Sequence, residues 1–184
     1  MTSTEQTLEQ FRTLTDRFTQ VVDAVADDRW TSASPCEGWT TTDVLDHVID
    51  SQRDFLGRHE LAVGEAPTGA PAVRWHAHQA AALNALGDGS VLAREFDSYF
   101  GPSTIGATLA TFFGLDLVVH RWDLAQAAGV GTELREDELD HVEACLDELG
   151  DNIYAQGACG PAVAVGDDAS RADRLIARTG RDPR

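Results

Sequence analysis

Three residues of one apolar segment, Asp116, His120 and Asp123, have the types and the spacing to act together. In an α-helix, residues four and seven apart are rotated by only about 40° and 20°, so these side chains fall on one line. The same line carries three apolar residues, Leu109, Phe112 and Ala127. We therefore expect it to be a buried seam. An ionised carboxylate in a dry core costs several kcal/mol unless it is paired or bound to a cation, and a divalent metal ion is the simplest partner.

The pair formed by Asp116 and His120 leaves other interpretations open. Residues four apart also form ordinary hydrogen bonds on helix surfaces, so the spacing alone is a weak motif. The apolar neighbours of the pair favour a metal site. Asp123 could accept a hydrogen bond from an imidazole N–H or pair with Arg121, and the sequence favours neither. In a third interpretation, Asp116 and His120 pair with Arg121 or with each other, and no metal binds.

The other nucleophilic and metal-ligating residues carry weaker signals. Cys36 lies in a loop before the second predicted helix, where a small loop hydrophobe is a better interpretation than a reactive thiol near the site. Four further histidines are interpreted as surface or satisfied core residues: His59, His76, His78 and His141. The chain has no HExxH, CxxC, GxSxG or GxGxxG motif, so zincin, zinc-finger, hydrolase and dinucleotide-binding chemistry have no support.

Composition excludes several function classes. The formal net charge of −17 repels phosphate backbones, which argues against nucleic acid as a partner. All 14 basic residues are arginines, and the absence of lysine removes Schiff-base, pyridoxal-phosphate and P-loop chemistry. Five arginines crowd the C-terminal segment: Arg171, Arg174, Arg178, Arg181 and Arg184. For these, a tail lying on the acidic body is favoured over an anion-binding edge.

The length fits one domain, residues 1–184, that can bury about 70% of its unfolded surface. No apolar run approaches the roughly 18 residues of a membrane helix, and the polar N-terminus resembles neither a signal nor a transit peptide. Three scattered cysteines fit a reducing compartment better than a disulfide framework. We therefore expect a cytoplasmic protein with no membrane partner. The oligomeric state stays open, and a homodimer is one option.

Apolar periodicity predicts an all-α fold. Four substantial helices are expected over residues 4–26, 41–56, 72–86 and 102–129. A fifth helix is expected over 135–149 and a short last helix over 171–177, with a loop over 57–71 and an extended ribbon over 88–102. His47 falls on the flank of the second helix, so periodicity alone does not bury it. The predicted architecture is an up-and-down four-helix bundle with a long crossing connection.

Two segments resemble a known family. Residues 34–48, SPCEGWTTTDVLDHV, resemble the second-helix signature of the DinB-like superfamily, in the branch named for mycothiol-dependent maleylpyruvate isomerase. Residues 116–125, DLVVHRWDLA, resemble the later metal helix of the same branch. Residues 160–165 and 175–183 resemble the closing segments of a short stand-alone subfamily. The resemblance implies a DinB-like four-helix bundle, here with a short extra C-terminal helix. It also implies a divalent metal ion, commonly zinc, bound by His47, Asp116 and His120.

The resemblance also implies an activity. In the isomerase class the thiol is mycothiol, and its thiolate adds to a conjugated double bond, which rotates before the thiol is eliminated. The chain departs from the isomerase in having aspartate rather than glutamate at Asp116 and in being too short for the additional C-terminal domain. Metal binding is thus better supported than maleylpyruvate as substrate. Zinc, nickel, iron and manganese all stay open as the native metal.

The expected function is therefore that of a metal-dependent transferase or isomerase using a small thiol and a small electrophile. Three protein ligands leave an open position on a metal ion, as in catalytic sites. In this interpretation Asp123 orients an imidazole, and Arg121 or the C-terminal arginines receive an anionic substrate. The alternative is a non-catalytic metal-binding or small-ligand-binding module, in which Cys36 or another histidine fills the fourth position.

Overall fold

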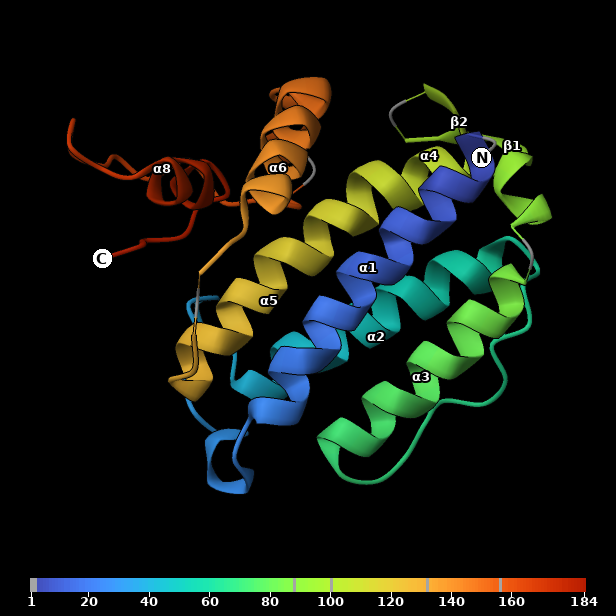
Figure 1. Cartoon of the computed structure of the whole chain (residues 1–184), viewed down its shortest axis with the longest axis horizontal. Helices are drawn as coiled ribbons and strands as arrows, with labels where there is room; N and C mark the ends of the chain where they lie inside the picture. Colours follow the sequence, from blue (N-terminus) through green and yellow to red (C-terminus); the bar gives the residue numbers. More distant parts are fainter. Residues whose placement is uncertain (1–2, 88, 100, 132, 156) are drawn as a thin grey trace.

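The computed structural model describes residues 3–87, 89–99, 101–131, 133–155 and 157–184. Four long helices form a bundle (Figure 1): α1 (Ser3–Ala24), α2 (Thr41–Arg58), α3 (Pro71–Leu86) and α5 (Gly114–Ala128). Helices α1 and α2 lie diagonally opposite each other, because each packs against both α3 and α5. The predicted all-α, DinB-like bundle is confirmed.

The long crossing connection lies between α2 and α3. These two helices run in the same direction, so residues 59–70 have to return along the length of the bundle before α3 begins (Figure 1). The two other helices, α1 and α5, run opposite to them. The bundle is therefore not a simple up-and-down arrangement.

Local sequence signals explain where α2 and α3 begin and end. Asp43 accepts a hydrogen bond from the Thr40 backbone at 2.8 Å, and its own backbone N–H donates to the Thr40 hydroxyl at 3.2 Å, which completes a capping box. Helix α3 begins at Pro71, whose missing N–H costs nothing in a first turn. Its last residue, Leu86, is followed by the capping residue Gly87, whose φ of +55° favours glycine.

The predicted fourth helix does not begin near Pro102. Pro102 lies in β2 (Gly101–Thr104), which pairs antiparallel with β1 (Glu95–Ser98) as a small hairpin. This hairpin confirms the ribbon that the sequence predicts, although residues 88 and 100 lie outside the described residues. The helix begins instead as α4 (Ile105–Thr108), because the Thr104 hydroxyl accepts a hydrogen bond from the backbone of Ala107 at 3.0 Å.

A π-helical turn, η3 (Leu109–Phe113), joins α4 to α5. Because a π turn advances by more residues per turn than an α-helix, it breaks the regular line that the sequence predicts through Leu109 and Phe112. Helix α5 is also buried on nearly every side, so the predicted seam is not distinct from the rest of the helix. Gln126 is exposed, Asp116 is partly buried, and the other residues of this helix are buried. The carboxylate of Asp116 therefore keeps 13% of its side-chain surface exposed within an enclosed helix.

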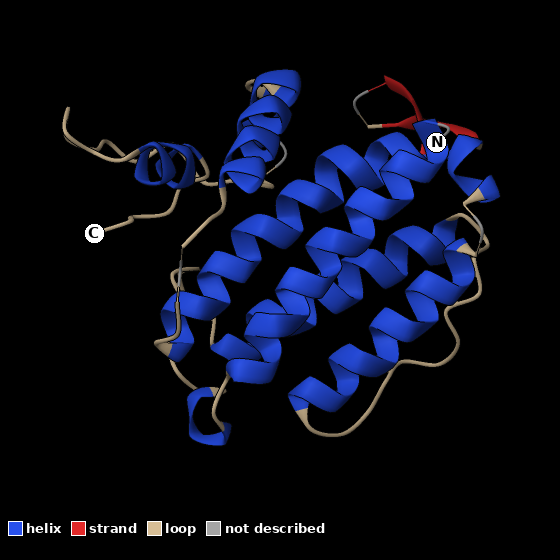
Figure 2. Cartoon of the chain, viewed as in Figure 1, coloured by secondary structure: helices blue, strands red, loops and turns tan. Residues whose placement is uncertain are grey.

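The remaining chain covers the outside of the bundle. Helix α6 (Glu136–Leu149) packs on α5, α8 (Arg171–Arg178) packs on α6, and the short α7 (Asn152–Ala155) was not predicted. Two short 3₁₀ turns, η1 (Asp27–Arg29) and η2 (Ser90–Ala93), complete the described elements. Figure 2 shows that strand is confined to the hairpin at one end.

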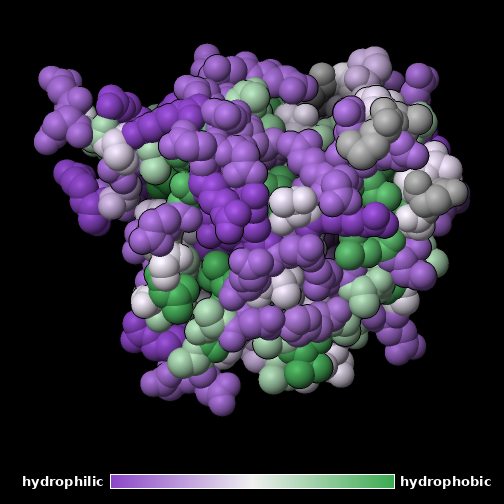
Figure 3. Space-filling view, in the orientation of Figure 1, coloured by the Kyte–Doolittle hydropathy of each residue, from purple (hydrophilic) through white to green (hydrophobic). Residues whose placement is uncertain are grey.

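The face drawn in Figure 3 is mostly hydrophilic, with hydrophobic side chains in small separate groups. This surface agrees with the strongly acidic composition. Within the described residues, every helix is too short or too polar to span a bilayer.

Candidate metal centre

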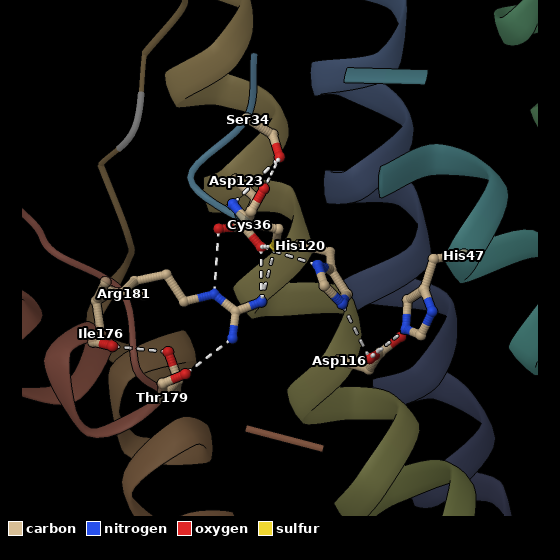
Figure 4. A network of polar contacts seen from close by, with 9 residues as sticks. All are labelled: Ser34, Cys36, His47, Asp116, His120, Asp123, Ile176, Thr179 and Arg181. Carbon is tan, nitrogen blue, oxygen red and sulfur yellow. Dashed lines mark hydrogen bonds and ion pairs between the residues drawn. The ribbon is translucent and has the colours of Figure 1, made fainter. Parts of the chain in front are cut away.

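Three side chains from two helices converge between α2 and α5 (Figure 4). The Asp116 Oδ1 lies 3.6 Å from the Nε2 of His47 and 3.3 Å from the Nε2 of His120. One potential ligand atom from each residue lies within 4.8 Å of the other two. The structure therefore brings together the three residues that the resemblance assigns to a metal ion.

The distances between the ligand atoms in this group fit a metal ion, and so does a carboxylate oxygen that is unpaired among the described residues. Zinc binds nitrogen and oxygen ligands at about 2.0–2.2 Å in a tetrahedron, which separates two ligand atoms by roughly 3.3 Å. The distances from Asp116 Oδ1 to the Nε2 atoms of His120 and His47, 3.3 and 3.6 Å, are close to that value. The other carboxylate oxygen of Asp116, Oδ2, is buried and has no hydrogen-bond partner among the described residues. A buried carboxylate oxygen without a donor is costly, and a cation would remove that cost.

Asp123 holds His120 in the orientation that such a site needs. Its Oδ2 lies 2.8 Å from the Nδ1 of His120, and the Asp123 side chain is fully buried. A carboxylate can only accept, so Nδ1–H is the donor and Nε2 faces Asp116. Asp123 therefore contacts the imidazole and not Arg121, whose guanidinium pairs with Glu138 at 2.9 Å. That buried pairing also makes Arg121 a poor receptor for substrate.

Arg181 reaches the same carboxylate from the C-terminal segment. Its Nη2 lies 2.8 Å from Asp123 Oδ2 and its Nε lies 3.2 Å from Asp123 Oδ1, while Nη1 donates to the Thr179 carbonyl at 2.9 Å. The clustering of C-terminal arginines predicts that Arg181 lies in a surface tail. That interpretation describes Arg171 and Arg178, which pair with acids of α6. Arg181 instead is buried, and no signal in the sequence separates it from the other C-terminal arginines.

Cys36 lies closer to this network than the sequence suggests. The Cys36 side chain packs against the hydrophobic core, as expected of a small hydrophobic residue. Its thiol also donates a hydrogen bond to Asp123 Oδ2 at 3.3 Å. The Sγ lies 3.4 Å from Arg181 Nη2. These contacts place the thiol on the Nδ1 side of His120, whereas Asp116 lies on the Nε2 side. Cys36 is therefore not positioned as a fourth ligand beside Asp116.

Trp39 forms a wall over the two imidazoles. Its ring is stacked on that of His120 with centroids 6.2 Å apart and is tilted against that of His47 at 5.0 Å. Trp39 immediately precedes the capping residue of α2, so the start of that helix fixes the wall. No motif in the sequence predicts that Trp39 belongs to the site.

The charges of the group are strongly coupled. Burial alone would raise the pKa of Asp116, but the imidazoles of His120 and His47 lower it below its ordinary value. Burial alone would lower the pKa of His120, but the carboxylates of Asp116 and Asp123 raise it well above its ordinary value. Asp116 and His120 thus form an ion pair when no metal is bound. A metal ion has to displace a proton from His120 to bind there.

The four histidines interpreted as surface or core residues lie elsewhere. His76 contacts Asp23 at 2.8 Å, and the fully buried His78 contacts Gln52 at 3.0 Å. His141 contacts Gln10, and His59 packs against Phe55 and Phe96. None of the four belongs to a metal-ligating group among the described residues.

Comparisons with known proteins agree with this geometry. The family model of the mycothiol maleylpyruvate isomerase N-terminal domain matches residues 11–125, which include His47, Asp116 and His120. Two Mycobacterium tuberculosis proteins are each 30% identical to this chain over 131 residues: uncharacterized protein MT0763 of strain CDC 1551 / Oshkosh and uncharacterized protein Rv0738 of strain ATCC 25618 / H37Rv. The match covers 65% of this chain and 65% of each relative, slightly less than two thirds of their length. No solved structure matches the chain. The chain belongs to the family of mycothiol maleylpyruvate isomerase N-terminal domains.

Proposed function

We propose that this chain binds a divalent metal ion, zinc in preference to nickel, iron or manganese, through His47, Asp116 and His120. We further propose that it uses the ion in a reaction between a low-molecular-weight thiol of the mycothiol type and a small electrophile. One observation carries the proposal. The Nε2 atoms of both imidazoles converge on one carboxylate whose second oxygen is buried without a hydrogen-bond donor.

The number of protein ligands favours a catalytic over a structural site. Among the described residues, no fourth histidine, cysteine or acid joins the group formed by His47, Asp116 and His120. Sites with three protein ligands keep a position open for water or substrate. When bound, the ion would lower the pKa of a thiol in that position and so supply a nucleophile at neutral pH.

The surrounding residues have separate tasks in this proposal. Asp123 accepts the Nδ1–H of His120 and so keeps Nε2 directed at the ion. Arg181 supplies a second cationic partner to the fully buried Asp123, beside the imidazole of His120. Trp39 shields one side of both imidazoles from water. Each of these residues positions a ligand, and none of them needs to touch the substrate.

A non-catalytic module is the competing proposal, and it requires a closed coordination sphere. The closest thiol, Cys36, contacts Asp123 on the opposite side of the His120 ring. A closed site would therefore need the loop around Cys36 to move. This requirement makes the module the weaker of the two proposals.

The deciding experiment has two parts. The purified protein is first analysed for bound metals without added ions, and we expect close to one divalent ion per chain. The metal-loaded protein is then incubated with mycothiol and a panel of small electrophiles, and loss of free thiol is measured. Metal-loaded protein that consumes no thiol with any electrophile would support the module instead. Protein that never binds a metal ion would overturn both proposals.

A further inference from the structure

A large cavity shares helix α2 with the candidate metal centre. It has a volume of about 810 Å³ and lies between the second half of α2, the π turn η3 and the β1–β2 hairpin. Cavities of roughly 300–1,000 Å³ are typical of small-molecule sites. Ser51 of its wall follows His47 by one helical turn in α2. Cβ atoms one turn apart in an α-helix are about 5–6 Å apart, so this wall of the cavity begins beside one of the proposed ligands.

Aromatic rings form the walls of this cavity, which we call the aromatic cleft. It is lined by six aromatic rings: Phe55, His59, Phe96, Tyr99, Phe112 and Phe113. The histidine and phenylalanine rings contact one another in a chain, with centroids 4.3 Å apart for His59 and Phe96 and 4.9 Å apart for Phe55 and Phe113. Burial and the nearby Arg94 lower the pKa of His59, which favours its neutral imidazole. Such walls favour a flat apolar ligand through edge-to-face and stacked contacts.

The mouth of the aromatic cleft is acidic. Arg58 is the only cationic side chain that lines it among the described residues, and this guanidinium is paired with Asp54 at 2.7 Å. Asp97 and Glu148 also line it, and neither forms an ion pair within the described parts of the chain. An adjoining cavity of about 530 Å³ shares these two acids, adds Glu95, and contains no arginine in its described lining. An anionic ligand entering here would be repelled, and a cationic one would be attracted.

We infer that the aromatic cleft binds the electrophile, and that this substrate is an aromatic molecule with no negative charge, a cationic one being preferred over an anionic one. That the bound molecule is the electrophile rests on the proposed function. The preference of the aromatic cleft for ligands without negative charge does not rest on it. It also separates this chain from the carboxylate substrate in the name of its family. Such an acid would meet Asp97 and Glu148 with no free cation in the described lining to receive it.

Binding of three matched probes tests this inference. Naphthylethylamine, naphthylethanol and naphthylacetate share one aromatic body and differ in charge, and none of them is an electrophile. Their affinities are measured by calorimetry at low ionic strength, with both metal-depleted and zinc-loaded protein. We expect the amine to bind at least about tenfold more tightly than the acetate, with the alcohol between them. Equal binding of the three probes, or tighter binding of the acetate, would overturn the inference.

Two sets of variants separate the contribution of the aromatic walls to probe binding from that of the acidic side chains. Phe96→Ala should weaken all three probes by about three- to tenfold, because it removes one ring of the wall. Phe96→Leu should give a smaller loss, and it keeps the test informative if the alanine variant does not fold. The double variant Asp97→Asn/Glu148→Gln should remove most of the preference for the amine and leave the alcohol unchanged. Asp27→Asn/Asp28→Asn, which removes two exposed acids of η1, is the matched control and should keep the preference.

The outcomes distinguish the cleft from the proposed function. Probe binding with the expected preference, in a protein that consumes no thiol, would retain the cleft and overturn the function. Thiol-dependent activity without any effect of Phe96→Ala on probe binding would retain the function and overturn the cleft.

Discussion

Arg181 and Asp123 form a bidentate ion pair next to the Nδ1 atom of His120. The guanidinium Nε and Nη2 contact separate oxygens of the carboxylate, at 3.2 and 2.8 Å. Burial alone would raise the pKa of Asp123, but His120 and Arg181 together lower it, so the carboxylate stays ionised inside the protein. A segment 58 residues further along the chain thus determines how a proposed metal ligand is held.

Removing this cation should destabilise the fold. We expect Arg181→Met to lower the free energy of unfolding by about 3–5 kcal/mol, because it leaves the fully buried Asp123 with one fewer partner. Urea denaturation of the metal-free protein measures the change. Arg184→Met is the matched control, since Arg184 forms an exposed ion pair with Asp182 and its loss should have little effect. Equal stability of the two variants would contradict a structural role for Arg181.

A second variant separates the ion pair from simple packing. Arg181→Met combined with Asp123→Leu removes both charges and should recover much of the stability that Arg181→Met loses. The double variant should nevertheless bind metal more weakly by about 10–100-fold, because His120 loses the acceptor that orients it. Competition with a chromogenic chelator gives the affinity. The single variant Asp123→Leu is measured as well. If the double variant loses as much stability as Arg181→Met and Asp123→Leu together, the two residues do not act as a pair.

Loss of a proposed ligand should abolish metal binding with little effect elsewhere. We expect Asp116→Ala and His47→Ala to weaken zinc binding by more than about a hundredfold, since even supporting residues typically contribute 10–100-fold. Asp116→Glu keeps the carboxylate and should retain the metal. His76→Ala removes an imidazole that contacts Asp23 outside the group, so its metal content should match that of the unaltered protein. A similar loss in His76→Ala would indicate a general effect on folding.

Cys36 should be the only thiol that reacts quickly in the folded protein. Cys36 is half-buried, whereas Cys145 and Cys159 are buried. Burial also raises the pKa of Cys145 to about 12 and raises that of Cys159. We expect iodoacetamide at pH 8 to modify one thiol per folded chain and three in urea. Cys36→Ser should abolish the fast reaction.

The effect of metal on this reaction distinguishes an open site from a closed one. Cys36 groups with His120 and Asp123 on the far side of the imidazole from Asp116, so zinc held by His47, Asp116 and His120 should slow its modification only slightly. Complete protection of Cys36 by zinc would indicate that its thiol is a ligand. That result would favour the non-catalytic module.

His78 should make stability depend on pH below neutrality. Burial, with a smaller effect of Arg53, lowers the pKa of His78 to about 4 in the folded protein from 6.5 in an unfolded chain. Between these values the unfolded chain binds the extra proton, so stability falls as the pH falls from about 6.5 to about 4. The contribution of this residue is up to roughly 3 kcal/mol. His78→Gln should reduce that slope, and the difference between the two proteins cancels the other titrating groups.

Local signals explain why much of the fold could be predicted from the sequence. The capping box at Thr40, the proline at the start of α3 and the glycine at its end all act within a few residues. The beginning of α4 was misplaced because Thr104 caps it two residues after Pro102, which belongs to the hairpin. The π turn was not predictable, because its i to i+5 hydrogen bonds leave no periodic pattern over five residues.

The site was predictable to a smaller extent. Spacing within one helix brought Asp116, His120 and Asp123 together, but His47 came only from a family resemblance, because it lies on the flank of its own helix. Arg181, Cys36 and Trp39 come from segments far apart in the sequence, and no spacing rule connects them with α5. Long-range contacts of this kind depend on how the helices pack, which a single sequence does not reveal.

The separation of Arg181 from Asp123 also bears on how the protein is made. The ribosome delivers α5 before the segment that carries Arg181, so the bundle can begin to pack while Asp123 still lacks its cation. A nascent chain at that stage would either keep the carboxylate hydrated or protonate it, and either would leave His120 poorly oriented. Metal loading should therefore follow completion of the chain rather than guide the early steps of folding.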